Sequence, residues 1–372
     1  MSVTSCAHIR RALNRKCAAL GIPSSGIFEL TPRCNLRCKM CYVRLTPEQM
    51  APIGQERTAA EWIDLARQAR DAGMLFLLLT GGEPMLRPDF CEIFEAVSQM
   101  GLSITVNTNG TLLTEPVRQL WHRSPPAQVN ITLYGTCRED YDALCGNPEA
   151  FDAVADALDW LNQEGILVHL NTTIVPTNVH KWKEIEEFAL ARGLELRMTT
   201  YCYPPTRRCG PDFERLEPEL AGKLMVDDIY YRLGPDEILF KAADLGVPSP
   251  HSCELDNGEP MQCTAAKSQF WMTWHGKMAP CAMLPQPLTA PFDTGFLPAW
   301  EELKQLCQPI RLCPECVNCP EQRSCMNCAA VTFSETGRFD GKPEYMCRMN
   351  RAYRTAVLEL AEQLKKEKAS PV

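Results

Sequence analysis

Three cysteines lie within eight residues of one another, as Cys34, Cys38 and Cys41 in the spacing C-x3-C-x2-C. Thiolates grouped this closely suit an iron–sulfur cluster or a zinc ion. A closed structural site takes four protein ligands, whereas three ligands leave one coordination position open for a small molecule. The count of three therefore favours a catalytic metal centre. A zinc knuckle that takes its fourth ligand from elsewhere is the alternative.

A second group of residues suited to binding follows the apolar run Met74–Thr80, where the sequence reads Gly81-Gly82-Glu83-Pro84. Paired glycines allow the backbone to approach a ligand closely. The carboxylate of Glu83 adds an acceptor for an ammonium group. Such a sequence alone is often only a turn, but its position one strand and one helix after the cysteines favours a binding site.

The C-terminal third is unusually rich in cysteine, and the whole chain contains 20. In a secreted protein they would predict disulfides, but no secretory signal precedes them, because Met1–Leu20 has scattered arginines and no apolar core. In a reducing compartment, clustered cysteines indicate metal binding or catalysis, with a zinc ribbon as one form. The cysteines of this group are Cys263, Cys281, Cys313, Cys316, Cys319, Cys325, Cys328 and Cys347.

The composition of the 372 residues is that of an ordinary globular protein, with 45% hydrophobic and 23% charged residues. The net charge of −8 argues against a nucleic-acid partner or an anionic membrane surface. No apolar run reaches the roughly 18 residues of a membrane span. We therefore expect a cytoplasmic protein.

Strand and helix patterns alternate after residue 24 and predict a parallel sheet with covering helices. A partial (β/α)6 barrel and a doubly wound sheet both fit this alternation, and either places its ligand at the C-terminal ends of the strands. Glycines at 73, 101, 165 and 193 are expected to end helices. The predicted strands are 27–30, 74–80, 102–107, 128–133, 168–175 and 195–200, and the predicted helices are 7–20, 58–72, 89–100, 115–122, 150–163, 179–191 and 350–366.

Together, C-x3-C-x2-C and the following Gly-Gly-Glu resemble the two motifs of the radical S-adenosylmethionine (SAM) enzymes. The resemblance implies a [4Fe–4S] cluster on Cys34, Cys38 and Cys41, with SAM on the free iron. Gly81, Gly82 and Glu83 would then bind the amino group of SAM. Tyr42 would lie beside the adenine, and Thr132 would contact SAM from the fourth strand. Asn109 and Asn171 are further polar candidates at strand ends, and ordinary barrel-lining residues are the alternative for Asn109, Thr132 and Asn171.

The C-terminal cysteines resemble the SPASM domain, which holds auxiliary iron–sulfur clusters. Cys263 is followed by twelve residues, Gly276, four residues and Cys281. The family closes its central block with C-x3-C, whereas Cys325 and Cys328 enclose two residues, and Cys313 is additional, so the register of this block stays open. The implied distal cluster has Cys316, Cys319, Cys325 and Cys347 as ligands. The implied proximal cluster has Cys263, Cys281 and Cys328, with either Cys253 or an open iron completing it.

The resemblance implies the fold class α/β, as a partial (β/α)6 TIM barrel with a smaller cysteine-rich C-terminal SPASM-like domain. The cofactors would be SAM, the [4Fe–4S] radical SAM cluster and one or two auxiliary [4Fe–4S] clusters. We expect a helical extension at 1–23, the barrel at 24–205, a bridging region at 206–262, the cluster domain at 263–347 and a C-terminal helix at 348–372.

Residues that would act on the substrate are less well marked. Cys137 and Cys145 are candidate hydrogen-atom donors, with inert buried thiols as the alternative, and Tyr134 occupies a position where sulfatase-oxidising relatives have an aspartate. Arg207 and Arg208 could bind a carboxylate or an acidic peptide, or lie in a solvated linker.

Auxiliary clusters in such relatives accept an electron from the substrate or bind it, which favours a net two-electron oxidation. The leading hypothesis is a maturase that forms a cross-link in a ribosomally made peptide, with a flavodoxin or ferredoxin as electron donor. Only about 25 residues precede the barrel, so either a separate protein recognises the leader or the substrate binds the barrel directly.

Three alternatives to a peptide maturase remain. An anaerobic sulfatase-maturing enzyme has a similar layout, but such relatives place an aspartate base where this chain has Ala282. A small-molecule alcohol dehydrogenase of the same superfamily is the second alternative. A zinc-bound protein-interaction module is the third, and it would explain the cysteines but not Gly-Gly-Glu-Pro.

Overall fold

The structure, a computed structural model, describes residues 3–205, 213–247, 260–317 and 319–369. Its centre is one sheet with the strand order β6-β5-β4-β3-β2-β1-β7-β8. Neighbouring strands run parallel from β6 through β1 to β7, and β8 is antiparallel to β7. The strands are β1 (Ser25–Glu29), β2 (Phe76–Thr80), β3 (Ser103–Thr108), β4 (Gln128–Thr132), β5 (Val168–Thr173), β6 (Glu195–Thr199), β7 (Gln269–Met272) and β8 (Met278–Ala279).

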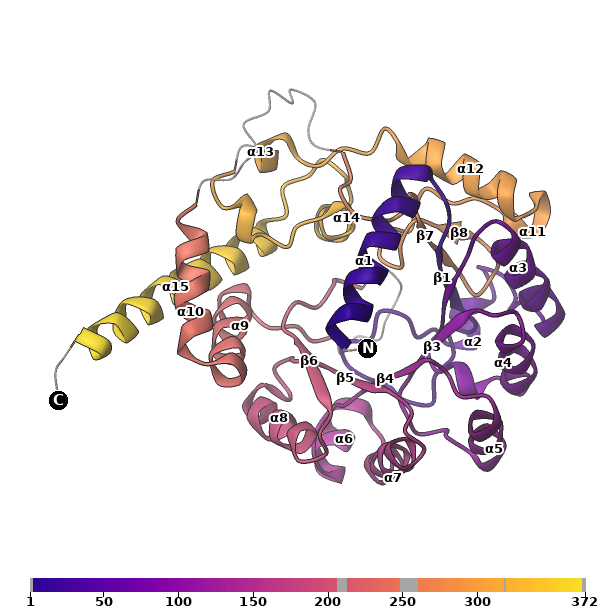
Figure 1. The fold of residues 1–372 in the computed structure, drawn as a ribbon, viewed down its shortest axis with the longest axis horizontal. Coiled ribbons are helices and arrows are strands. Elements are labelled where there is room, and N and C mark those ends of the chain that lie inside the picture. The colour runs from indigo at the N-terminus through magenta and orange to yellow at the C-terminus, as the bar shows by residue number, and fades with distance from the viewer. Residues whose placement is uncertain (1–2, 206–212, 248–259, 318, 370–372) are drawn as a thin grey trace.

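The order of the first six strands decides between the two architectures that the sequence allows. A doubly wound sheet reverses its strand order near the middle, whereas β1 to β6 follow one another without a reversal. Figure 1 shows the sheet curving into an open barrel with α3, α4, α5, α7 and α8 on its outside. The fold is therefore a partial (β/α)6 barrel, and the six predicted strands agree with β1–β6 to within two residues at each end.

The helices complete the alternation and add a separate group near the C-terminus. α1 lies across the middle of the barrel in the view of Figure 1, and α9, α10 and α15 lie together at one side of it. The helices are α1 (Val3–Leu20), α2 (Pro47–Met50), α3 (Ala59–Asp71), η1 (Pro84–Leu86), α4 (Phe90–Ser98), α5 (Glu115–Arg123), α6 (Arg138–Cys145), α7 (Ala150–Gln163), η2 (Val179–Lys181), α8 (Trp182–Leu190), α9 (Pro218–Leu233), α10 (Pro235–Leu245), α11 (Pro291–Thr294), α12 (Phe296–Cys307), α13 (Pro314–Val317), η3 (Gln322–Ser324), α14 (Ala329–Thr336) and α15 (Glu344–Ala369).

The burial pattern of the strands explains why the sheet has two different faces. In β4, Val129 and Ile131 are fully buried, whereas Asn130 and Thr132 are only partly buried. β3 and β5 show the same alternation, with apolar side chains on the helix-covered face. Successive residues of a strand point to opposite faces, so the partly buried polar side chains face the interior of the barrel.

Local sequence signals set the helix boundaries. Thr58 caps α3 through a capping box with Glu61, which satisfies backbone donors of the first turn. The glycines at 73, 101, 165 and 193 all have positive φ values, which confirms the predicted helix ends. The helix predicted at 7–20 begins earlier, at Val3, and α6 was not among the predicted helices.

β7 joins the barrel sheet from the C-terminal part of the chain. It pairs in parallel with β1 from Ser25↔Gln269 to Phe28↔Met272. Trp271 reaches across this pair, and its Nε1 donates to the buried carboxylate of Glu29 at 3.1 Å. The cysteine-rich part therefore packs directly on the first strand of the barrel.

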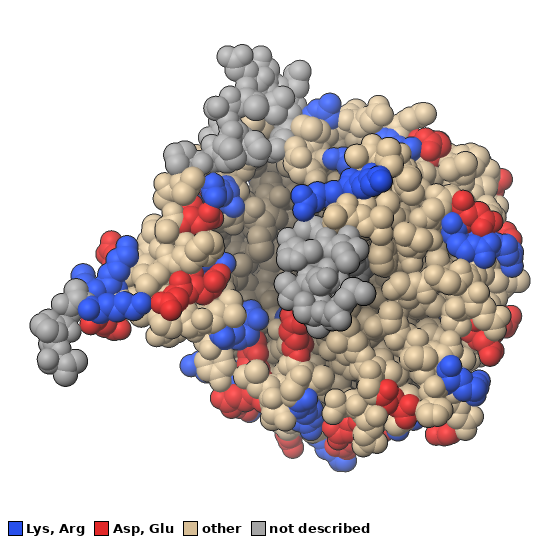
Figure 2. Space-filling view, in the orientation of Figure 1, with Lys and Arg blue, Asp and Glu red and all other residues tan. Residues whose placement is uncertain are grey.

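The surface carries charges of both signs. On the face in Figure 2, the Lys and Arg residues lie among Asp and Glu residues over the barrel helices and over the helices at the side. No helix in the described parts of the chain is both long enough and apolar enough to span a membrane.

Candidate metal and cofactor site

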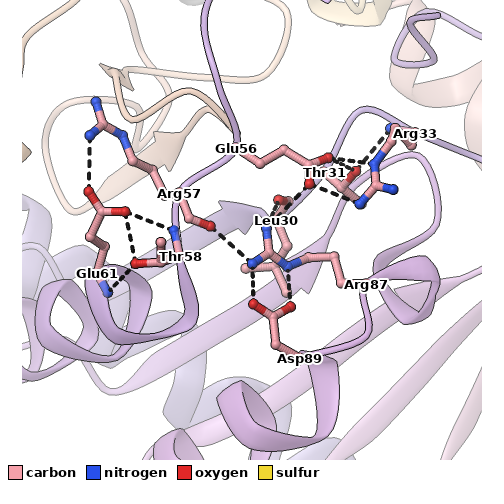
Figure 3. A network of polar contacts seen from close by, with 9 residues as sticks. All are labelled: Leu30, Thr31, Arg33, Glu56, Arg57, Thr58, Glu61, Arg87 and Asp89. Atoms are coloured by element: carbon pink, nitrogen blue, oxygen red, sulfur yellow. Dashed lines mark hydrogen bonds and ion pairs between the residues drawn. The ribbon is translucent and has the colours of Figure 1, made fainter. Parts of the chain in front are cut away.

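The segment with Cys34, Cys38 and Cys41 leaves β1 at the C-terminal end of the sheet, and a buried arginine fixes its start. Arg87 is 5% exposed, and its guanidinium donates to Leu30 O at 3.0 Å and to Arg57 O at 3.0 Å (Figure 3). Asp89 accepts two further bonds from the same group, at 2.8 and 2.6 Å. One side chain thus ties the end of β1 to the segments before α3 and α4.

A second ion pair continues this network toward the cysteines. Arg33 forms a two-point ion pair with Glu56, with N–O distances of 2.8 and 2.9 Å (Figure 3). The hydroxyl of Thr31 donates to the same carboxylate. Two-point pairs of this kind fix orientation as well as position. The residue directly before Cys34 is therefore held in a defined orientation.

Gly81 and Gly82 pack against the backbone of the cysteine loop. A β-carbon on Gly81 would lie 2.4 Å from Thr31 O, and one on Gly82 would lie 2.3 Å from Arg33 O. Gly82 N also donates to Thr31 O at 2.8 Å. The glycines thus allow two segments of the chain to approach each other closely, and their predicted contact with a ligand stays a prediction.

Glu83 is fully buried at the end of β2. Its carboxylate accepts from Thr108 Oγ1 at 3.0 and 2.9 Å, Asn109 N at 2.7 Å and Met85 N at 3.1 Å. Burial raises the pKa of this carboxyl group to about 7, against the opposing effect of these hydrogen bonds. A buried carboxylate with this pKa gains stability from a cationic group, such as an ammonium.

The three cysteine thiols receive hydrogen bonds from nearby groups. Leu36 N donates to Cys34 Sγ at 3.4 Å, and Arg44 N donates to Cys41 Sγ at 3.3 Å. Burial raises the pKa of Cys34 to about 12 and also raises that of Cys41. A hydrogen bond from Cys145 lowers the pKa of Cys38. Ionised thiolates at these buried positions would need positive charge nearby. The irons of a cluster would supply it, so the three cysteines fit a [4Fe–4S] cluster.

Of the four other predicted SAM-binding residues, Asn109, Thr132 and Asn171 lie at or near the C-terminal ends of strands, and Tyr42 lies in the loop after β1. Asn109 Nδ2 donates to Cys34 Sγ at 3.6 Å and to Asn35 Oδ1 at 2.9 Å, so it supports the cysteine loop in this structure. Thr132 and Asn171 are partners in the register of β4 and β5. Tyr42 is partly buried against the core.

The three candidates for chemistry on the substrate lie around α6. Tyr134 precedes the helix, Cys137 is its N-cap and Cys145 is its last residue. Eight helical residues separate the two thiols by about 12 Å along the axis. Cys145 is fully buried close to Cys38, whereas Cys137 is partly exposed at the far end of the helix.

Six of the predicted auxiliary ligands line one cavity of about 260 Å³ in the C-terminal part of the chain. Four of them lie within electrostatic range of one another, with Cys325 and Cys347 near both Cys316 and Cys319. Burial raises the pKa of Cys316 to about 12 and that of Cys325 to about 11. The six are Cys263, Cys316, Cys319, Cys325, Cys328 and Cys347.

The three remaining predicted ligands lie in different places. Cys281 lies near Cys328 and Cys263, the two cysteines that the sequence analysis groups with it. Cys313 is buried and interacts with Cys316. Cys253, together with Arg207 and Arg208, lies outside the described residues.

Tyr203 connects the two cysteine-rich regions, a role that the sequence analysis did not assign. It follows β6 and lies close to Cys328, Cys281 and Tyr42. Its ring packs edge-on against Tyr201 with centroids 4.9 Å apart. The aromatic residues after the sixth strand were visible in the sequence, but their partners lie more than 70 residues away along the chain.

Among the described residues, no three His, Cys, Asp or Glu side chains are close enough together to ligate a single metal ion. In a [4Fe–4S] cluster each cysteine binds a different iron. The spacing of the cysteines described here is therefore compatible with a cluster, although it does not suit a single metal ion.

Residues 28–189 match the model of the radical SAM superfamily. Over 84% of its length the chain is 25% identical to the AdoMet-dependent heme synthase of Methanosarcina barkeri, of which it covers 93%. It is 29% identical to the PqqA peptide cyclase of Rhizobium meliloti, over 47% of this chain and 46% of that protein. The crystal structure of Streptococcus suis SuiB bound to its precursor peptide SuiA superposes with a TM-score of 0.64, covering 92% of this chain and 80% of that chain at 17% identity. This last likeness shows that the fold is shared over most of the chain.

Proposed function

We propose that this chain, in which residues 28–189 form a radical SAM domain, takes a hydrogen atom from an amino acid side chain of a ribosomally made peptide. The product would be a cross-link or another oxidised peptide. SAM and a [4Fe–4S] cluster are the cofactors of the domain, and when bound they supply reductive cleavage of SAM and a radical able to attack an unactivated carbon.

The chain's own residues have distinct parts in this proposal. Cys34, Cys38 and Cys41 would hold the cluster. The carboxylate of Glu83 would accept a hydrogen bond from the amino group of SAM. The burial that raises the pKa of Glu83 also makes a cationic partner for this carboxylate favourable. The other residues proposed to bind SAM are Tyr42, Gly81, Gly82, Asn109, Thr132 and Asn171.

The observation that carries the oxidative part of the proposal is the cavity with six cysteine thiols in the C-terminal region. Cys316, Cys319, Cys325 and Cys347 would hold one auxiliary cluster, and Cys263, Cys281 and Cys328 a second. Such clusters can accept the electron that remains on a substrate after hydrogen abstraction. Tyr203 would separate the proximal auxiliary cluster from the SAM site, because it lies near both Cys328 and Tyr42.

Three observations support a peptide substrate. One relative is named a peptide cyclase, and the shared fold occurs in a structure with a bound precursor peptide. The barrel interior also presents side-chain amides, where Asn130 Nδ2 donates to Asn107 Oδ1 at 2.7 Å. Side-chain amides can both donate to and accept from a peptide backbone.

A second candidate function is the one named for the Methanosarcina barkeri relative, haem synthesis, because that similarity extends over 84% of this chain and 93% of the relative. A sulfatase-maturing activity has less support. Ala282, at the position of the aspartate base, packs against the apolar side chains of Ile27 and Trp271.

The test is anaerobic reconstitution followed by analysis of iron, sulfide and 5′-deoxyadenosine. The enzyme is then incubated with SAM, a reduced flavodoxin or ferredoxin, and short peptides encoded beside its gene. A peptide that loses two hydrogens supports the maturase. Haem formation from a porphyrin precursor, with every peptide unchanged, would support the second candidate. About one zinc per chain and no sulfide would refute both functions.

A further inference from the structure

The C-terminal end of α6 meets the cysteine loop at Cys38. Arg37 N donates to Cys145 O at 2.9 Å, and Lys39 N donates to Leu144 O at 3.1 Å. These bonds use the residues on either side of Cys38. The last carbonyls of a helix lack partners within the helix, so the loop satisfies two of them. Cys38 is thereby fixed over the end of α6.

This arrangement places the Cys145 side chain against the Cys38 sulfur. Cys145 is 0% exposed, and its thiol lies within interaction range of the Cys38 thiol. The helix ends directly after it, at Gly146 with φ +66°. The backbone and side-chain contacts of Cys145 therefore converge on one cluster cysteine.

Tyr134 lies beside the same sulfur. Its hydroxyl is within interaction range of Cys38, and its ring packs edge-on against Tyr141 of α6 with centroids 5.8 Å apart. Asn178 Nδ2 donates to its backbone carbonyl at 3.4 Å. Tyr134 is thus held on both its ring and its backbone.

We propose that Cys145 and Tyr134 are positioning residues for the cluster on Cys34, Cys38 and Cys41, called here the initiating cluster. Hydrogen bonds from these two side chains to Cys38 would raise the reduction potential of that cluster. The proposal rests on the proposed function, since it takes Cys38 to be a cluster ligand. Reduction adds one negative charge to a cluster, and donors to its sulfurs stabilise that charge. Within the described part of the chain, Cys38 has two side-chain donors within reach, whereas the bonds to Cys41 come from backbone amides.

The experiment compares the reconstituted parent enzyme with Tyr134→Phe, Cys145→Ala and the control Cys91→Ala. Cys91 lies on α4, on the outside of the barrel. The initiating cluster is identified as the electron paramagnetic resonance signal that changes when SAM is added, and its midpoint potential is measured by redox titration. Tyr134→Phe keeps the ring and removes only the hydroxyl, so it tests the hydrogen bond even if Cys145→Ala disturbs the fold.

We expect both substitutions near Cys38 to shift the midpoint to a more negative potential. The ratio of reduced to oxidised cluster at a fixed potential should fall about tenfold, which corresponds to about 59 mV for a one-electron couple. Cys91→Ala should match the parent. A Tyr134→Phe enzyme with parental iron content and parental midpoint would overturn this inference while leaving the proposed function intact. A parent enzyme with no SAM-sensitive signal would overturn both.

Discussion

The backbone oxygen of Arg33 lies 2.3 Å from the position that a β-carbon on Gly82 would occupy. The segment that carries the three cysteines and the segment that carries Glu83 are therefore in backbone contact. Glu83 N donates to Arg33 O at 2.9 Å, so the same carbonyl both requires the glycine and positions the glutamate. The two sequence motifs form one structural unit.

Gly82→Ala should therefore disturb both motifs at once. The added methyl group meets a backbone atom, which cannot move aside as a flexible side chain can, so we expect a loss of about 1–3 kcal/mol in stability. 5′-Deoxyadenosine formation should fall at least about tenfold, because small displacements in an active site have effects of this size. Gly246→Ala is the control, since its β-carbon would meet only Ala243 O, at 3.4 Å, and its φ is not positive. Parental SAM cleavage by Gly82→Ala would contradict the backbone contact.

Arg87→Lys should lower stability, although it conserves charge. The lysine ammonium cannot reproduce the planar fork that reaches Leu30 O, Arg57 O and Asp89 together. Because breaking a buried pair leaves unpaired polar groups, we expect a loss of about 3 kcal/mol in the free energy of unfolding, measured by urea denaturation under anaerobic conditions. Arg67→Lys is the matched control, because Arg67 pairs with Asp64 at the surface. An equal, small effect of both substitutions would show that Arg87 does not fix the loop.

Cys316→Ala and Cys347→Ala should lower the iron content by about four atoms per chain, the content of one cubane cluster. Both thiols line the C-terminal cavity, some distance along the chain from the loop at 34–41. SAM cleavage should therefore continue at a reduced rate, while the peptide product is lost. Replacing Cys34, Cys38 and Cys41 together should abolish SAM cleavage. Retained cleavage in that triple variant would refute the assignment of the initiating cluster.

The alternation of strands and helices could be predicted from the sequence because it depends on local signals. Apolar runs mark the six strands, and Gly73 and Gly165 end helices where their positive φ suits glycine. β7 could not be predicted in the sheet, because a four-residue strand carries little signal of its own. Its pairing with β1 joins residues more than 240 positions apart.

The motifs of the candidate site could be predicted from the sequence, but the contacts between them could not. The spacing of Cys34, Cys38 and Cys41 is visible in the sequence, whereas the contact of Cys145 with Cys38 depends on α6, which the periodicity did not reveal. Arg87 appears as an ordinary surface-type residue in the sequence. Only the fold shows that it is buried and holds the end of β1.

Glu186→Gln should change the pH dependence of stability. Glu186 lies on α8, is 2% exposed, and faces Asp228 and Arg232 of α9, with Arg232 Nε 3.4 Å from its Oε1. Burial, and then the neighbouring Asp228 carboxylate, raise the pKa of Glu186 to about 7. A carboxyl group with a raised folded-state pKa stabilises the protein most below its unfolded value of about 4.3, and that contribution is lost as the pH rises through about 7.

Glutamine carries no charge at any pH, so Glu186→Gln should be more stable than the parent at pH 8, by about 1–3 kcal/mol, since one pKa unit corresponds to about 1.36 kcal/mol. At pH 5 this advantage should largely disappear, because the parent carboxyl group is then mostly protonated. Urea denaturation at both pH values measures the difference, and Glu184→Gln is the control, because Glu184 lies on the same helix with an exposed side chain. The same stability difference between Glu186→Gln and the parent at pH 5 and at pH 8 would mean that Glu186 keeps an ordinary pKa. Only a carboxyl group that ionises between these pH values makes that stability difference depend on pH.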